Sequence, residues 1–370
     1  MTAMTFDFSE VLRRMVEVRA SDVHLTAGFP PAMRDKGKIV PMEGFPALDS
    51  QETRETVFSI LNDDQRKRFE NEKQLDFAYA IPNVARFRVN CFMQRGAVSA
   101  AFRLVPQEIP SLDSLGVPQV LRELTAKPRG FVLVTGPTGS GKSTTLAAML
   151  DVINRENQDH ILTIEDPIEF LHQHKRSIVN QREIGADADS FALGLRAALR
   201  QDPDVILVGE MRDMETIGTA LTAAETGHLV FATLHTQDAP QTVDRIIDVF
   251  PPAQQGQVRA QLAIGLQGIV TQTLIPTADG VGRCVAAEVL IPTPGVRNLI
   301  REGKTHQIYS LIQTGGQHGM QTMDASLAGL VAHGRITMAA AETRSSEPAE
   351  MRKLVEAKIL EAQQGYSVAA

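Results

Sequence analysis

The stretch GPTGSGKST, residues 136–144, has the clearest chemical meaning in this sequence. It fits the pattern G-x-x-x-x-G-K-[ST], whose glycines let backbone N–H groups point closely at phosphate oxygens. Lys142 would reach the β- and γ-phosphates of a nucleotide, and the hydroxyl of Ser143 would bind Mg²⁺. An apolar run precedes the loop and a helical stretch follows it, as this pattern requires. The predicted ATP-binding residues are Gly136, Pro137, Thr138, Gly139, Ser140, Gly141, Lys142, Ser143 and Thr144.

Two other apolar runs end on carboxylates. ILTIED ends with Glu165 and Asp166, and VILVGE ends with Glu210. In an open α/β sheet, ligands bind beyond the carboxyl ends of the strands, so these side chains would face the same nucleotide. ATP hydrolysis needs a Mg²⁺ partner and a carboxylate that orients the attacking water. We assign the metal role to Glu210 and the water to Glu165, although the pattern also allows the reverse assignment and purely structural roles.

Two histidines bracket the apolar run LVFATL in residues 227–236. His235 follows the run and would donate to the γ-phosphate, so that hydrolysis would release it and signal to the next helix. His228 precedes the run, and we count it among the nucleotide-binding residues, with positioning of a neighbouring element or subunit as its alternative role. Hydrogen-bonded structural histidines are the competing interpretation for both. The strand between them makes a shared metal improbable.

Composition limits the class of protein. The chain has 370 residues, 43% of them hydrophobic and 22% charged, which is typical of a globular protein with two domains. The net charge of −7 gives no general reason to expect nucleic-acid binding. Cys91 and Cys284 are too few for a disulfide framework and are expected to be buried free thiols. We find no secretory signal or membrane-spanning run, and therefore expect a cytoplasmic protein.

The elements that must position these residues fall into two regions. Residues 1–105 mix helical stripes with runs that alternate in period two, which predicts a small α+β domain with an antiparallel sheet. Residues 106–118 contain three prolines and predict an extended linker. From residue 119 to 370, apolar runs alternate with helices, which predicts a doubly wound α/β domain, then a hairpin and C-terminal helices.

The motifs, in their order, resemble the secretion ATPase superfamily of type II and type IV machines. They include ASDVHL near the N-terminus, the phosphate loop, TIEDPIEF, the histidine box TGHLVFATLHT, and GVRNLIREGKTHQIYSLIQTG at residues 295–315. Within that superfamily the chain is most similar to the retraction ATPases of type IV pili, the PilT family. The resemblance covers about residues 8–338.

The resemblance implies a PAS-like N-terminal domain joined to a RecA-like P-loop ATPase domain with a helical C-terminal region. It implies a homohexamer that hydrolyses Mg-ATP and drives pilin depolymerisation and twitching motility. Arg88 and Arg103 match arginines that reach the phosphates, and guanidinium groups suit that role. The implied partner is an inner-membrane platform protein of the PilC type. The ring would thereby associate peripherally with the cytoplasmic face of that membrane, without nucleic acid.

Some features depart from the family pattern and leave alternatives open. Gly295 and Val296 replace the usual Ala-Ile of the C-terminal signature, and residues 94–96 replace an asparagine-rich turn. A PilU-type accessory ATPase remains an alternative, as does an extension or type II secretion ATPase. The latter usually carries a four-cysteine zinc insertion that this sequence lacks. A RecA-like DNA translocase and a scaffold that does not hydrolyse ATP are alternatives from other classes.

Overall fold

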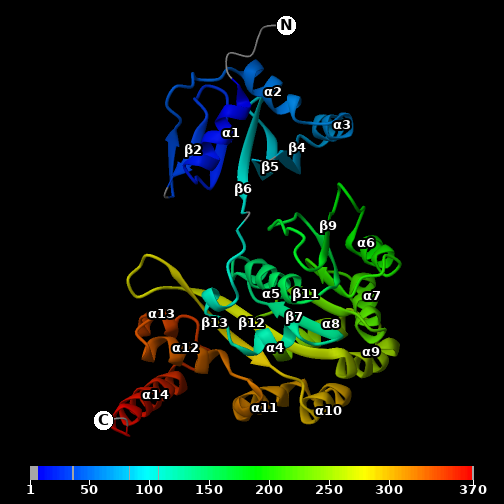
Figure 1. The fold of residues 1–370 in the computed structure, drawn as a ribbon, viewed down its shortest axis with the longest axis vertical. Coiled ribbons are helices and arrows are strands. Elements are labelled where there is room, and N and C mark those ends of the chain that lie inside the picture. The colour runs from blue at the N-terminus through cyan, green and yellow to red at the C-terminus, as the bar shows by residue number, and fades with distance from the viewer. Residues whose placement is uncertain (1–6, 36, 83, 107, 369–370) are drawn as a thin grey trace. The chain divides into compact units, whose positions relative to one another are not determined.

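The computed structural model describes residues 7–368 except 36, 83 and 107, with side chains described up to residue 360. The chain divides into two compact units (Figure 1). The first comprises residues 1–108 with 169–171, and the second comprises residues 109–168 and 172–370. No described helix combines the length and the hydropathy that a membrane span requires.

The first unit is an antiparallel sheet with three helices, and its order along the sheet is β3-β2-β1-β6-β5-β4. This confirms the predicted antiparallel α+β character. Alternating burial along β5 places Phe87, Val89 and Cys91 in the core. Its elements are α1 (Phe8–Glu17), β1 (Asp22–Leu25), β2 (Ala32–Asp35), β3 (Lys38–Pro41), α2 (Ser50–Ser59), α3 (Asp63–Glu72), β4 (Gln74–Ile81), β5 (Ala85–Gln94) and β6 (Ala97–Val105).

The second unit is built on a seven-stranded sheet of order β13-β12-β7-β11-β10-β8-β9. The strands are parallel except for β13, which forms the predicted hairpin with β12. Parallel pairing brings the carboxyl ends of β7, β8, β10 and β11 to one edge of the sheet. The strands are β7 (Gly130–Thr135), β8 (His160–Glu165), β9 (Ile178–Glu183), β10 (Val205–Val208), β11 (Leu229–Leu234), β12 (Leu266–Pro276) and β13 (Arg283–Leu290).

Helices connect these strands and continue beyond the sheet. The predicted helical C-terminal region is confirmed, and its last helix buries Met351 and Val355. The helices are α4 (Val120–Thr125), α5 (Lys142–Glu156), α6 (Phe191–Ala198), α7 (Met214–Glu225), α8 (Ala239–Asp248), α9 (Pro252–Gly265), α10 (Pro294–Glu302), α11 (Ile308–Thr314), α12 (Met323–Ala332), α13 (Met338–Glu342) and α14 (Pro348–Val368).

Part of the predicted linker is packed in the second unit. Leu112 is buried, and Ile109, Leu115 and Val117 pack against the same apolar cluster as Leu121. A short 3₁₀ turn, Asp113–Leu115, replaces extended backbone there. Apolar burial therefore makes residues 109–117 part of the second unit.

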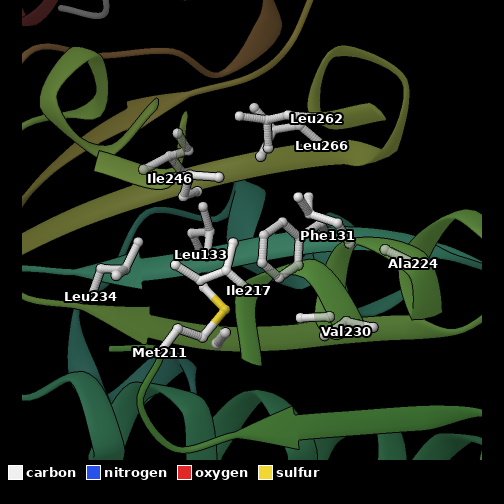
Figure 2. Close-up of a cluster of buried hydrophobic side chains, with 14 of the residues drawn as sticks. Phe131, Leu133, Met211, Ile217, Ala224, Val230, Leu234, Ile246, Leu262 and Leu266 are labelled. Atoms are coloured by element: carbon white, nitrogen blue, oxygen red, sulfur yellow. The ribbon is translucent and has the colours of Figure 1, made fainter. Parts of the chain in front are cut away.

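The apolar core beside the phosphate-loop strand holds the sheet and helices in register. Phe131 and Leu133 on β7 are fully buried against residues of α7, β11 and α9, as Figure 2 shows. Because β7 leads directly into the phosphate loop, packing around these side chains fixes the position of that loop.

Replacing Phe131 with Ala is expected to destabilise the fold by about 3–5 kcal/mol, because a buried aromatic ring leaves a cavity. Chemical denaturation would measure the loss. The Val281→Ala protein is the control, since Val281 is 88% exposed. Equal effects from both substitutions would contradict this view of the core.

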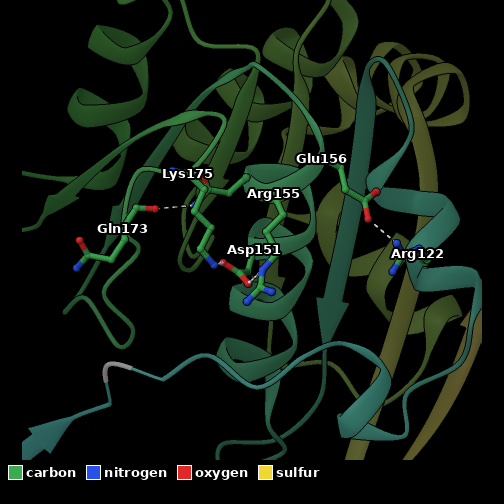
Figure 3. A network of polar contacts seen from close by, with 7 residues as sticks. Arg122, Asp151, Arg155, Glu156, Gln173 and Lys175 are labelled. Atoms are coloured by element: carbon green, nitrogen blue, oxygen red, sulfur yellow. Dashed lines mark hydrogen bonds and ion pairs between the residues drawn. The ribbon is translucent and has the colours of Figure 1, made fainter.

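Polar contacts anchor the helix that follows the phosphate loop (Figure 3). Asp151 of α5 is buried and pairs with Lys175, and it accepts a hydrogen bond from Arg155 Nε at 2.6 Å. Asn154 donates to the Gln173 carbonyl at 2.7 Å. Because a buried carboxylate needs such partners, these contacts fix α5 to the connection between β8 and β9.

Candidate active site

The phosphate loop runs from the end of β7 to the start of α5. Gly136, Gly139 and Gly141 have φ values of 131°, 78° and 91°, a region that side chains other than glycine rarely adopt. Gly141 immediately precedes α5, so the loop turns directly into the helix N-terminus. The first N–H groups of a helix favour anions, and this geometry suits a phosphate group.

Gly136 has no room for a side chain. A Cβ atom there would lie 2.2 Å from the Gln272 carbonyl oxygen and 2.8 Å from Ser140 Oγ. The Gly136→Ala protein is therefore expected to lose nucleotide binding by at least about tenfold and to become less stable, because backbone atoms must move. Calorimetric titration with ADP would measure the binding.

The matched control is Gly256→Ala. Gly256 lies in α9, has no neighbouring atom within 4 Å of an added Cβ and has no positive φ. Alanine is expected to stabilise that helix by about 0.5–1 kcal/mol and leave binding unchanged. Normal ADP binding by the Gly136→Ala protein would show that the loop tolerates a side chain.

Lys142 lies over the loop that precedes it. Its Nζ donates to the carbonyl oxygens of Gly136 at 2.8 Å and Pro137 at 3.0 Å, and lies 3.5 Å from His235 Nδ1. The residue is only 8% exposed. The ammonium group is thus held by neutral acceptors, which anionic phosphate oxygens can replace with stronger charge-assisted hydrogen bonds.

His235 links Lys142 to Glu210. The distance from His235 Nε2 to Glu210 Oε1 is 2.9 Å. Because an ammonium group only donates and a carboxylate only accepts, Nδ1 faces a hydrogen-bond donor and Nε2 faces an acceptor. Each nitrogen of the imidazole is thus directed at a group of the site.

Glu210 also accepts a hydrogen bond from Arg212 at 2.6 Å. That bond is the largest cause that lowers the Glu210 pKa, and His235 lowers it further, whereas burial opposes both. The carboxylate therefore stays ionised at neutral pH. The structure brings Lys142, His235 and Glu210 together as one connected group at the carboxyl edge of the sheet.

Glu165 ends β8 at the same edge. Its Oε1 accepts from Thr163 Oγ1 at 2.6 Å and from Gln181 Nε2 at 3.1 Å. β8 lies beside β10, where the Gly209 N–H donates to the Ile164 carbonyl at 2.8 Å. These bonds restrict the orientation of the Glu165 carboxylate, as a group that aligns a water molecule requires.

His228 is not brought to this group. It precedes β11 and lies beside the amino end of β7, where its carbonyl accepts from the Gly130 N–H. Its Nδ1 lies 3.0 Å from the Ala223 carbonyl oxygen. The strand between His228 and His235 spans about 20 Å. Within one subunit the structure thus places His228 at the opposite end of β11 from the phosphate loop, and its role in nucleotide binding stays a prediction.

Arg88 and Arg103 lie in the first unit as directly opposed residues on β5 and β6. Arg103 Nε donates to Asp22 Oδ1 at 2.8 Å, and Arg88 Nε lies 4.0 Å from Asp76 Oδ1. Both arginine side chains remain partly exposed. Asp22 belongs to the ASDVHL stretch. Burial raises the pKa of Asp22, but its hydrogen bonds with Ser21 and Arg103 lower it, and the net result is a pKa below the ordinary value. The unit thus presents two adjacent guanidinium groups on one sheet.

Several supporting residues were missed in the sequence. Gln272 of β12 donates to the Ser140 carbonyl at 2.9 Å, and Thr271 Oγ1 lies 2.8 Å from Thr135 Oγ1. The pairing of β12 with β7 brings them there across more than a hundred residues, which no local pattern reveals. Arg212 was detectable, because it lies two residues after Glu210, just beyond the apolar run VILVGE.

Known proteins resemble this chain in sequence and in fold. The model of the family described as type II/IV secretion system protein matches residues 65–362. The type IV pilus retraction ATPase PilT of Pseudomonas aeruginosa is 52% identical over 92% of this chain and 99% of its own length. A twitching motility protein of Neisseria gonorrhoeae is 51% identical over 90% of this chain and 91% of its own length. The crystal structure of the pilus retraction motor PilT with bound ADP superposes with a TM-score of 0.88 and 50% identity, covering 94% and 99% of the two chains.

Proposed function

We propose, because this chain belongs to the type II/IV secretion system protein family, that it hydrolyses ATP to power the retraction of type IV pili. The observation that carries the proposal is the connected group of Lys142, His235 and Glu210 beside the phosphate loop. The names of the chain's relatives indicate a role in pili, and the chain's own residues indicate ATP hydrolysis.

In the proposed reaction, the phosphates of ATP displace the loop carbonyls from Lys142. The ammonium group then stabilises the charge that develops on the transferred phosphoryl group. Glu165 orients the attacking water, while Nε2–H of His235 exchanges its contact with Glu210 for one with the γ-phosphate. Loss of the γ-phosphate lets His235 return to Glu210, so the end of β11 reports the state of the nucleotide.

The donor set fits Mg²⁺. The hydroxyl of Ser143, in the first turn of α5, and the ionised Glu210 offer the hard oxygen ligands that this ion prefers. The described residues contain no group of three or more His, Cys, Asp or Glu side chains arranged for a metal. Mg²⁺ usually keeps waters and substrate phosphates as ligands, so such a group is not required. When bound, it would neutralise charge on the phosphates.

We also propose a homohexamer of PAS-like and RecA-like domains at the cytoplasmic face of the inner membrane, acting on a PilC-type platform protein. Arg88 and Arg103 would complete the site of a bound nucleotide, and His228 would contact a neighbouring element or subunit. The residues between Val105 and Ile109 would act as the hinge. The two adjacent guanidinium groups support this proposal, since their planar charge suits phosphate.

A deletion of the gene tests the direction of the motor. Loss of a retraction ATPase should leave cells with more surface pili that no longer shorten. Bald cells would instead indicate an extension ATPase, and defective secretion with normal pili would indicate a type II secretion ATPase. Normal pili that retract only under low load would indicate a PilU-type accessory role. Salt-sensitive DNA binding by the purified chain would favour a DNA translocase.

A further inference from the structure

Glu288 of β13 is a buried carboxylate outside the active site. The residue is 3% exposed and pairs across the sheet with Thr271, the residue that contacts the end of β7. No cation pairs with Glu288 among the described residues. A carboxylate in such a place needs other partners, because burial of an unpaired charge is costly.

Two helix N-termini provide those partners. Glu288 Oε1 accepts a hydrogen bond from the N–H of Ala239, the first residue of α8, at 2.8 Å. β13 is also bonded to the segment where α12 begins, since the Val289 N–H donates to the Gln321 carbonyl at 2.8 Å and the Ala287 N–H donates to Ser326 Oγ at 3.0 Å. The backbone of Met323, the first residue of α12, lowers the pKa of Glu288. The first turn of a helix carries partial positive charge, so the Glu288 carboxylate interacts favourably with the start of both helices.

The first of these helices is close in sequence to the nucleotide site. Only residues 236–238 separate His235 from α8. Thr236 Oγ1 lies 2.6 Å from Thr242 Oγ1, and Asp238 accepts from the N–H of Gln241 at 2.7 Å. Because residues 236–238 are short and are hydrogen-bonded to α8, a displacement of His235 would move the first turn of α8.

The second helix leads to the end of the chain. Asp324 of α12 is buried, and its carboxylate accepts from the N–H groups of Ser346 and Glu347 just before α14. A buried carboxylate in the first turn of α12 therefore fixes the backbone that leads into α14. The contacts form a continuous path from α8 through Glu288 to the C-terminal helices.

We infer that Glu288 is a positioning residue of the ATPase cycle, which transmits the movement of α8 during nucleotide exchange to α12 and α14. The inference rests on the proposed function, because it requires His235 to respond to the nucleotide. Glu288 suits this role, since the start of α8 is hydrogen-bonded to its carboxylate and α12 is hydrogen-bonded to the strand that carries it.

The surroundings of Glu288 make its contacts with the starts of α8 and α12 sensitive to pH. Burial raises the pKa of Glu288 to about 7, the Ala239 N–H opposes this, and the charges of Asp238 and Asp324 raise it further. On α11, burial is the largest cause that raises the Tyr309 pKa, and Glu288 contributes. Because the folded pKa lies above the ordinary value of 4.5, stability falls as pH rises from about 4.5 through 7. Ionisation above that pH strengthens the hydrogen bond from Ala239 and the attraction to the partial positive charge at the start of α12.

Hydrogen exchange of the full chain with and without ADP would test the inference. In the wild type, ADP should change the exchange of amides in both α8 and α12. In Glu288→Gln, which has a single acceptor oxygen, the change in α12 should fall at least about fivefold while that in α8 remains. The matched control, Glu347→Gln, alters an exposed carboxylate of the same region and should behave as wild type.

The wild-type protein alone provides a second measurement. Because burial raises the pKa of Glu288 to about 7, the group is more ionised at pH 8 than at pH 6, so the ADP response of α12 should be larger at pH 8. The Tm of Glu288→Gln relative to wild type should also rise from pH 6 to pH 8, because the amide does not ionise. An α12 that responds equally in Glu288→Gln, or fails to respond in an active wild type, would overturn the inference alone. A wild type that neither binds ADP nor releases phosphate would contradict the proposed function as well.

Discussion

The Lys142→Ala protein is expected to release phosphate from ATP at least about 100-fold more slowly than the wild type, because a charge that stabilises the transition state is removed. Lys142 is a buried cation of the phosphate loop, and its Nζ donates to two loop carbonyls and lies 3.5 Å from His235 Nδ1. Its loss should weaken ATP binding as well as slow the reaction. A phosphate-release assay with a titration of ATP would separate the two effects.

Lys127→Ala is the control for this substitution. Lys127 lies exposed in the same unit, just before β7, and outside the phosphate loop. Its removal changes the net charge equally and should leave the rate within about twofold, as is usual for surface positions. Comparable rates from the two variants would show that the loop is not the site of hydrolysis.

The Glu165→Gln protein should keep its affinity for ATP and lose turnover by about 10²–10⁴-fold, the range for a positioned base. An amide is of similar size and can keep the contacts with Thr163 and Gln181, but it cannot accept a proton from water. Glu210→Gln should instead raise the Mg²⁺ concentration needed for half-maximal activity, since that carboxylate is assigned to the metal. Magnesium titrations of both variants would measure this difference.

Glu123→Gln is the matched control, because Glu123 is an exposed carboxylate of α4 far along the chain from either strand end. It should leave both turnover and magnesium dependence unchanged. If Glu210→Gln abolished turnover at saturating Mg²⁺ while Glu165→Gln retained it, the two assignments would have to be exchanged.

Local patterns predicted much of this fold. Apolar runs bounded by glycine and polar residues identified β7, β8, β10 and β11, because a strand buried on both faces consists of such runs. The phosphate loop, Glu165, Glu210 and His235 were found for the same reason, since each follows one of those runs directly. The connection of Lys142 through His235 to Glu210 required the strand order, which places β11 between β7 and β10.

Elements with weak local signals were missed. β2 and β3 have four residues each and expose most of their side chains, so period-two alternation cannot appear in them. Gln272 acts on the phosphate loop only because β12 returns to β7 after a long excursion. His228 precedes its apolar run, so it lies at the amino end of β11, whereas the carboxyl ends of the strands lie beside the phosphate loop.

The shortening of labelled pili in living cells tests the central claim most directly. In cells whose chromosomal copy carries Lys142→Ala, we expect many surface pili that extend and then fail to retract, while Lys127→Ala cells retract them normally. Pili that shorten at the wild-type rate in Lys142→Ala cells would contradict the claim that ATP hydrolysis at this phosphate loop drives retraction.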